Sequence, residues 1–242
     1  MCTRHRRALA WGKTIKEFFS KLADDVANWF IKNKEKYKLV DKVDATLLGS
    51  TRILKSNPKF KDSIEYIKLI GRPLGKVLAL ESEAAINLYT KSYYILFNKA
   101  LRKLDGVKLT KEFRAMQKVL DDALNKLPIF KQNGFLMRSA YFSERDIKKL
   151  FKAGKDFVDK GFFSTTHSEA ALLKWMKTNP ADNVLFKVYG KNGKLIDVSS
   201  NIIPEAEVLF RSGTKFIVES VKPVQHPLNP LKEIFEIILK EK

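Results

Sequence analysis

Hydrophobic positions divide the chain into a helical first half and a strand-rich second half. Up to residue 126, apolar side chains recur at three- and four-residue spacings, which is the period of an amphipathic helix. From Leu127-Pro128 onward, short apolar runs bounded by turn residues replace that spacing and predict strands. Helices followed by strands indicate an α+β fold.

Helical periodicity covers three segments of the first half. Residues 11–34 predict an amphipathic helix whose polar face carries both lysines and aspartates. Such a helix can lie on a membrane, but the mixture of charge signs favours packing against the protein. Helix is also predicted within 38–104, with Ser82 as N-cap, and over 109–126, with Thr110 near the start.

The second half is predicted to contain strands interrupted by two helices. Strands are expected over 135–141, 161–164, 184–189, 195–198, 205–210, 215–221 and 234–239, and helices near 144–153 and 168–178. Asn192-Gly193 predicts a hairpin turn, and Ser212-Gly213 is expected to turn the next pair of strands. The segment 223–230 is expected to be linker-like.

Composition is typical of a globular protein and carries a large positive charge. The 242 residues are 45% hydrophobic, enough for one large domain or for a domain with a smaller one beside it. The net charge of +19 would attract polyanions such as nucleic acid, anionic lipid or an acidic protein face. A lysine-rich solvated surface explains the same charge without any polyanion.

The sequence indicates neither a metal site nor a disulfide. Cys2 is the single cysteine, and His5, His167 and His226 lack ligand spacing, so we expect no metal. No apolar run of signal-peptide length follows the basic start, and no stretch approaches the roughly 20 apolar residues of a membrane span. If the protein leaves its cell, we expect a specialised secretion system, phage injection or lysis.

Three separated motifs carry candidate chemistry. Arg138 lies on an apolar strand, where burial requires either an internal carboxylate or an anionic ligand; taken alone, this strand favours the internal ion pair. Ser164, Thr165 and Thr166 end an aromatic strand, where hydroxyls commonly cap the next helix.

The third motif is a pair of glutamates, Glu205 and Glu207, two residues apart on a predicted strand. Residues at this spacing share one face, so their charges repel each other unless the face is solvated or meets a cation. A solvent face and a cleft that stabilises a cationic transition state are both compatible with the pattern.

Together the motifs resemble the R-S-E class of mono-ADP-ribosyltransferases, over about residues 80–240. The resemblance rests on 83–102 as the helical signature before the core, 136–139 as the arginine strand, 164–166 as the Ser-Thr-Ser element, and 205–218 as the Glu-x-Glu strand with its hairpin. Two positions depart from the family pattern: Thr166 replaces a serine, and Ser139 replaces a common glycine. Neither departure removes a catalytic group.

The resemblance implies a two-sheet, strand-rich catalytic core over 76–242, preceded by a helical extension over 1–75. It implies NAD+ as co-substrate, with Arg138 on the phosphates and Ser139, Ser164, Thr165 and Thr166 around the nucleotide. Glu207 would be the catalytic glutamate beside the ribose. Glu205 would select arginine as acceptor, and NAD+ hydrolysis would be a side activity.

Partners and alternatives follow from these implications. A target protein with an acceptor arginine is expected, in the manner of a toxin or effector. A nucleic-acid acceptor is the runner-up, because of the charge. A non-catalytic polyanion- or membrane-binding protein on a degenerate transferase fold is the third interpretation. The extension over 1–75 could bind the target, dock on an anionic membrane, or seat a partner such as an immunity protein.

Overall fold

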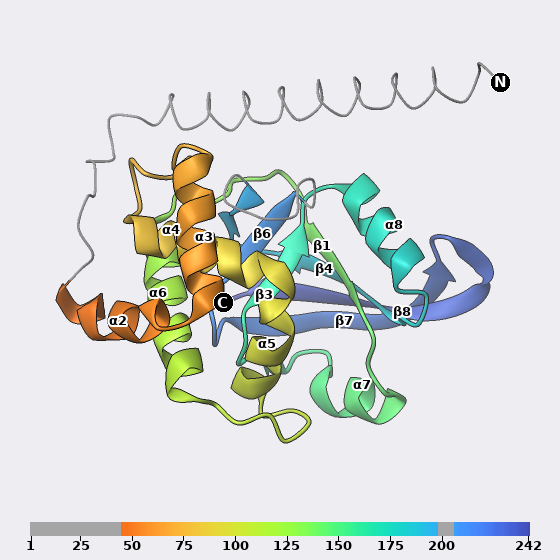
Figure 1. Cartoon of the computed structure of the whole chain (residues 1–242). Helices are drawn as coiled ribbons and strands as arrows, with labels where there is room; N and C mark the ends of the chain where they lie inside the picture. The colour runs from red at the N-terminus through yellow and green to blue at the C-terminus, as the bar shows by residue number, and fades with distance from the viewer. Residues whose placement is uncertain (1–44, 198–205) are drawn as a thin grey trace, which may run out of the picture.

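Residues 45–197 and 206–242, which the computed structural model describes, form a group of helices beside a mixed sheet (Figure 1). The helical elements are η2 (Ala45–Leu47), α2 (Leu48–Lys55), α3 (Pro58–Leu69), α4 (Leu80–Leu88), the π-helical η3 (Tyr89–Tyr93), α5 (Tyr94–Arg102), α6 (Lys111–Lys126), α7 (Glu144–Leu150) and α8 (Glu169–Thr178). The strands are β1 (Leu136–Ala140), β2 (Asp156–Val158), β3 (Phe163–Thr166), β4 (Val184–Tyr189), β5 (Lys194–Leu195), β6 (Glu207–Phe210), β7 (Lys215–His226) and β8 (Asn229–Glu241). The predicted α+β class is confirmed.

Side-chain caps start several helices, among them the helix whose start the sequence places near Thr110. The Asn57 side chain accepts a hydrogen bond from the N–H of Lys59 at the start of α3, and Pro58 occupies the first turn. Thr110 does the same for α6, accepting from the N–H of Phe113. The predicted helix over 11–34 lies outside the described residues.

The predicted N-cap at Ser82 is wrong. Helix α4 begins at Leu80, with Ala79 as the capping residue, and Ser82 is buried inside the first turn. The reason is local hydrogen bonding: the carbonyl of Ala79 already accepts from the N–H groups of Ser82 and Glu83.

Hydrogen bonding joins the strands into one eight-stranded sheet in the order β2-β7-β8-β4-β1-β3-β6-β5. The β4–β8 pair is parallel, and the other neighbouring pairs are antiparallel. The expected division into two sheets therefore does not appear as two separate ladders in the described residues. Strands β1, β3 and β6 are adjacent at the centre of one half, which brings together three segments that are distant in sequence.

The hairpin predicted at Asn192-Gly193 is wrong, whereas the turn predicted at Ser212-Gly213 is present. Residues 191–194 connect β4 to β5, and Ser212-Gly213 connects β6 to β7, but neither pair of strands is hydrogen-bonded. The chain does turn sharply: Gly213 has a φ of 74°, and a Cβ on Gly190 would lie 2.4 Å from the Phe210 ring. A turn signal marks a change of direction, but the strands then pair with other, sequence-distant neighbours.

The predicted linker over 223–230 is also wrong. It forms the outer part of a long β7–β8 hairpin, with Pro223 opposite Phe235 and Gln225 opposite Glu233, and the hairpin projects beyond the body of the sheet (Figure 1). Proline lacks the N–H that donates to a neighbouring strand. In the outer part of the hairpin each strand has its partner on one side only, so a missing donor on the other side costs no hydrogen bond. The short strand β2 was not predicted, because three residues give too little alternation to detect.

Two apolar clusters hold the layers together. One comprises residues of α2 to α6 and includes Phe60 and Phe97, and it also takes in Phe162 and Leu209 from the sheet side. The other lies among the strands and α7, with Phe186 and other phenylalanines in edge-to-face contact. Residues 45–70 thus share a core with the helices after residue 76, while the division at residue 75 stays a prediction.

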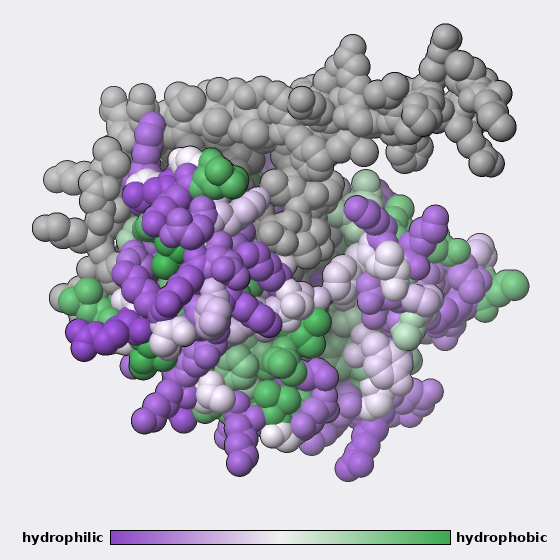
Figure 2. Space-filling view, viewed as in Figure 1, coloured by the Kyte–Doolittle hydropathy of each residue, from purple (hydrophilic) through white to green (hydrophobic). Residues whose placement is uncertain are grey.

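The visible surface is mostly polar, with apolar side chains gathered near α5 (Figure 2). Ile95, Leu96 and Leu104 are among the exposed apolar residues of this part of the chain. Within the described residues, no helix has the length and apolarity needed to span a membrane.

Candidate functional site

A cleft of about 520 Å³ opens between the helical layer and the sheet. Its helical wall comes from η3, α5 and α8, and its strand wall comes from β1, β3 and the start of β6. Arg138, Ser139, Ser164, Thr165, Thr166 and Glu207 all line it. The structure therefore brings these predicted site residues to one place, although up to 69 positions separate them in the sequence.

Arg138 is held in the cleft by neutral groups. Its Nη1 donates to the backbone carbonyl of Ser164 at 2.7 Å, and its guanidinium lies 5.2 Å from the centre of the Phe163 ring. Among the described residues it forms no ion pair with a carboxylate. Burial, and then the charge of Arg102, lower the pKa of Arg138. The internal ion pair favoured by the strand alone is thus not found there, and the positive charge faces the cleft.

Arg102, in contrast, is bound within the fold. Its Nε and Nη2 donate to both carboxylate oxygens of Asp159, at 2.7 and 2.8 Å, and Nη2 also donates to the carbonyl of Phe162. Asp159 also accepts from the N–H of Gly161. The arginine thus anchors helix α5 to the loop that leads into β3.

Asn98 makes a second link between α5 and the same loop. Its side-chain oxygen accepts from the N–H of Phe162 at 2.9 Å, and its nitrogen donates to the Tyr89 hydroxyl at 3.0 Å. A Cβ on Gly161 would lie 2.7 Å from the Asn98 oxygen, so this approach requires glycine. The helical signature recognised in the sequence therefore positions β3 and its hydroxyls.

The three consecutive hydroxyls of β3 play different parts. Ser164 lines the cleft on a partly buried strand position. Thr165 donates to the carbonyl of Val208 at 2.7 Å and so ties β3 to β6. Thr166 accepts from the N–H of Ser168, which is itself the N-cap of α8. The cap of α8 is thus two residues beyond this run, at Ser168, which Thr166 supports, and Ser164 lines the cleft.

Glu207 is buried, with 5% of its surface exposed, at the first position of β6. Its backbone N–H donates to the Asp197 carboxylate at 2.5 Å, and it lies opposite Thr166 in the ladder. Burial and the nearby charge of Glu207 both raise the pKa of Tyr89. A carboxylate is therefore held within the same cleft as the guanidinium of Arg138.

The strand predicted from Glu205 begins two residues later. Ala206 has a φ of 47°, which is left-handed backbone and incompatible with an extended strand, so β6 starts at Glu207. The prediction that Glu205 shares a face with Glu207 depended on an unbroken strand, and Glu205 itself lies outside the described residues.

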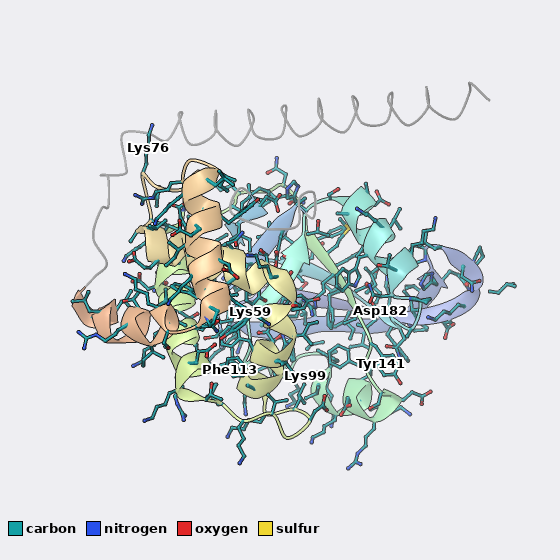
Figure 3. All side chains as sticks on the ribbon, viewed as in Figure 1. Lys59, Lys76, Lys99, Phe113, Tyr141 and Asp182 are labelled. Carbon is teal, nitrogen blue, oxygen red and sulfur yellow. The ribbon has the colours of Figure 1, made fainter. Side chains whose placement is uncertain are left out.

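Sequence reasoning named Ser139 but missed the cleft residue Trp175 and the aspartate, Asp182, that bonds to both. Ser139 donates to Asp182 at 2.6 Å, and the same carboxylate oxygen accepts from the indole of Trp175 on α8. Asp182 lies in the short segment between α8 and β4 (Figure 3), and a single aspartate there does not by itself predict a place in the site. Within the described part of the chain, no cluster of three or more histidine, cysteine or acidic residues is arranged to hold a metal ion.

Solved structures with the same fold define the class of protein. Exoenzyme S of Pseudomonas aeruginosa aligns with a TM-score of 0.62 at 19% identity, over 81% of this chain and 89% of that chain. The ADP-ribosyltransferase HopU1 of Pseudomonas syringae pv. Tomato DC3000 aligns at 0.63 and 18% identity, over 85% of this chain and 100% of that one. The fold is that of an ADP-ribosyltransferase.

The family model of ADP-ribosyltransferase exoenzymes matches residues 72–241, which is well over half of the chain. The chain belongs to this family. It is also 33% identical over 146 residues to the NAD(+)--protein-arginine ADP-ribosyltransferase Tre1 of Serratia proteamaculans (strain 568). That match covers 60% of this chain and 30% of Tre1, so the chain spans less than a third of this relative's length.

Proposed function

We propose that the chain cleaves NAD+ at the nicotinamide–ribose bond and transfers ADP-ribose to an arginine of a target protein. The observation that carries the proposal is the meeting of Arg138, Ser164 and Glu207 in one cleft. Each residue comes from a different strand, and membership of the exoenzyme family supports the same chemistry.

Glu207 supplies the charge that the reaction needs. As the N-glycosidic bond breaks, its electron pair passes to the nicotinamide nitrogen and positive charge develops on the ribose as an oxocarbenium ion. A carboxylate already fixed in a buried cleft stabilises that charge without reorganising. Glu207 meets this requirement through its burial and its place on β6. Ser164 orients Glu207 and the ribose.

Arg138 is suited to the phosphates of NAD+. A guanidinium donates two parallel hydrogen bonds to a pair of phosphate oxygens, which an ammonium cannot do. Its hydrogen bond to the Ser164 carbonyl uses Nη1, which leaves donors of the same group for a ligand. The backbone near Ser139, with Thr165 and Thr166, would complete the nucleotide site.

Glu205 is proposed to select the acceptor. A guanidinium is protonated at neutral pH, so it must be held by an anion and lose a proton as its nitrogen bonds to the ribose carbon. Glu205 would take that proton. Two relatives support an arginine acceptor: Tre1 is named as a protein-arginine transferase, and the ADP-ribosyltransferase Vis has been solved with agmatine. Water in place of the acceptor would give NAD+ hydrolysis as a side activity.

The proposed setting is a target cell. The fold is shared with bacterial effectors such as XopAI of Xanthomonas axonopodis pv. citri, a type III effector, at a TM-score of 0.64 and 16% identity. We infer delivery by a specialised route. Residues 1–75 are proposed to bind the target, an anionic membrane or an immunity protein, and the net charge of +19 supports a polyanionic surface among these partners.

The variant Glu205→Gln tests the acceptor. We expect it to abolish transfer to protein while much of the NAD+ hydrolysis remains, because Glu207 still drives cleavage and water captures the cation. Nicotinamide release and ADP-ribose bound to lysate protein are measured side by side. Glu219→Gln is the matched control, since Glu219 is on the surface strand β7 and pairs with Lys240; it should leave both activities unchanged.

The remaining outcomes separate the alternatives. Retained transfer to protein in Glu205→Gln would show that the acceptor is not arginine. Label that nuclease removes would indicate a nucleic-acid acceptor, and such labelling should fall steeply with added salt. Wild-type protein that releases no nicotinamide would support the non-catalytic interpretation.

A further inference from the structure

The Asp197 carboxylate takes the place of a backbone carbonyl where β5 meets β6. The ladder that pairs Leu195 with Val208 continues for one more position, at which the N–H of Ile196 donates to the carbonyl of Glu207 at 3.1 Å. In a regular antiparallel pair, the N–H of Glu207 would return that bond to the Ile196 carbonyl. It donates instead to the side chain of Asp197, at 2.5 Å. A charged acceptor, which binds an N–H more strongly than a carbonyl does, therefore holds the backbone of Glu207.

A buried carboxylate is an expensive acceptor for this N–H. Asp197 is 2% exposed, and a charge at that depth carries a desolvation cost that a neutral carbonyl avoids. The carboxylate is placed at the start of β6, where Glu207 lines the cleft, while the rest of the strand is buried in the two apolar clusters. Its position therefore indicates a requirement beyond the pairing of strands.

The backbone just before Glu207 is strained. Ala206 has a φ of 47°, in the left-handed region, where a Cβ is unfavourable. Its carbonyl accepts from the N–H of His167 at 3.2 Å. Strain of this kind persists where the surrounding structure fixes the backbone, and it commonly occurs at functional sites. The turn at Ala206 is therefore held by its neighbours against the ordinary preference of its residue type.

We propose that Asp197 is a positioning residue that orients the Glu207 carboxylate toward the ribose of bound NAD+. This inference rests on the proposed function. The carbonyl of Ala206 and the N–H of Glu207 belong to one planar peptide group, which is bonded to His167 at one end and to Asp197 at the other. Fixing that plane fixes the direction in which the Glu207 side chain leaves the strand. The carboxylate is then in place before charge develops on the ribose.

The variant Asp197→Ala tests the positioning role. We expect kcat for nicotinamide release to fall by about 10- to 100-fold, because a small misplacement of a catalytic group is costly. The KM for NAD+ should change little, since Arg138 and Ser139 lie on β1 and keep their own hydrogen bonds. Asp197→Asn should recover most of kcat, because its amide oxygen can still accept the N–H of Glu207.

The matched control is Asp121→Ala. The Asp121 carboxylate also accepts a backbone N–H beside β6, that of Ser212 after the other end of the strand, at 3.0 Å. Asp121 lies on α6, outside the cleft, so this variant should lose stability and keep its kcat. A purely structural role of Asp197 would give the same result, a lower melting temperature with unchanged kcat, and would overturn the proposal.

Two combined variants test whether Asp197 acts through Glu207 and through the turn. In Glu207→Gln, adding Asp197→Ala should lower kcat little further, because the carboxylate that Asp197 positions is already absent. Ala206→Gly should restore part of the kcat of Asp197→Ala, since glycine adopts a φ of 47° without strain. Fully additive losses in the first pair, or no recovery in the second, would contradict the proposal.

Nicotinamide release keeps this inference distinct from the proposed function. If Glu207→Gln is far slower than the wild type while Asp197→Ala retains the wild-type kcat, the proposed function stands and the positioning role alone is rejected. If the wild type releases no nicotinamide, or Glu207→Gln releases it at the wild-type rate, the proposed function is rejected and the positioning role falls with it.

Discussion

The two walls of the cleft use their polar groups in opposite ways. On the helical wall, Tyr89, Asn98 and Arg102 are bonded to one another or to the loop before β3. On the strand wall, Arg138 contacts a carbonyl and an aromatic ring and forms no ion pair among the described residues. Two arginines that line the same cleft thus differ in what satisfies their charge.

This difference separates stability from function. A buried arginine with a bidentate carboxylate is part of the fold, since removing one partner leaves the other charge uncompensated. A buried arginine that faces a cleft and forms no ion pair with a carboxylate is suited to an anionic ligand. We therefore expect substitutions on the helical wall to weaken folding first, and substitutions on the strand wall to weaken NAD+ use first.

The largest expected effect lies on the strand wall. Glu207→Gln should lower both transfer and NAD+ hydrolysis by about 10²–10³-fold, because it keeps the shape and removes the charge that opposes the oxocarbenium ion. Nicotinamide release measures the loss, and circular dichroism should show an unchanged fold, since the bond from Glu207 to Asp197 uses the backbone N–H. Hydrolysis at the wild-type rate would show that Glu207 is not the catalytic carboxylate.

Arg102→Met tests the helical wall. We expect the free energy of unfolding to fall by about 3 kcal/mol, because Asp159 keeps a buried charge without its cation. Urea unfolding measures the change. Arg211→Met is the matched control: Arg211 pairs with Asp121 but its side chain is 45% exposed, so its loss should cost less than about 1 kcal/mol. Equal losses would remove the distinction between a structural and a surface arginine.

Glu83 gives the helical layer a pH dependence. Burial raises the pKa of Glu83 to about 7, and the bonds from Leu74 and Arg72 only partly oppose this. The folded state therefore holds this proton at pH values where the unfolded state, in which the pKa of Glu83 is near its ordinary 4.5, has lost it. The contribution of Glu83 to stability is present below pH 4.5 and is lost as the pH rises through about 7.

The variant Glu83→Gln should remove this loss of stability at rising pH, because glutamine does not ionise. Between pH 5 and 7 the wild type should lose about 1–3 kcal/mol relative to the variant, and the two curves should run parallel above pH 8. Urea unfolding at several pH values checks this, and groups that titrate in both proteins cancel in the difference. Parallel curves from pH 5 upward would contradict the raised pKa.

The smallest effect is expected from Arg138→Lys. The positive charge remains, but the bidentate hydrogen bonds of the guanidinium are lost. The KM for NAD+ should therefore rise by about tenfold, while the free energy of unfolding changes little. Steady-state nicotinamide release and urea unfolding are measured on the same protein. An unchanged KM with reduced stability would place Arg138 with Arg102, as an internal structural group.

Local signals in the sequence predicted much of the fold. The start of α6 near Thr110, the helical period of α6 and the apolar runs of β1 and β4 were each predicted from neighbouring residues. Predictions that depended on which strand pairs with which were less successful. The Asn192-Gly193 turn was read as a hairpin, yet β5 pairs with β6, which lies 12 or more residues further along.

The candidate site shows the same limit. The residue types of Arg138, Ser164 and Glu207, and their order, came from the sequence through a family pattern. The backbone at Ala206 and the shared acceptor at Asp182 gave no local signal. Both depend on contacts between segments far apart in the chain, which no periodicity or propensity reports.

By itself, the sequence determined the α+β class, most element positions and the chemical groups available for the reaction. Spacing and capping act within a few residues, so they leave a readable pattern. The tertiary structure alone decided which groups are satisfied by the fold and which face the cleft. Arg102 and Arg138 are the same residue type on apolar segments, and they differ because Asp159 lies within 3 Å of one of them. Electrostatic pairing acts through space, and its outcome is set when β1, β3 and β6 come together beneath α5.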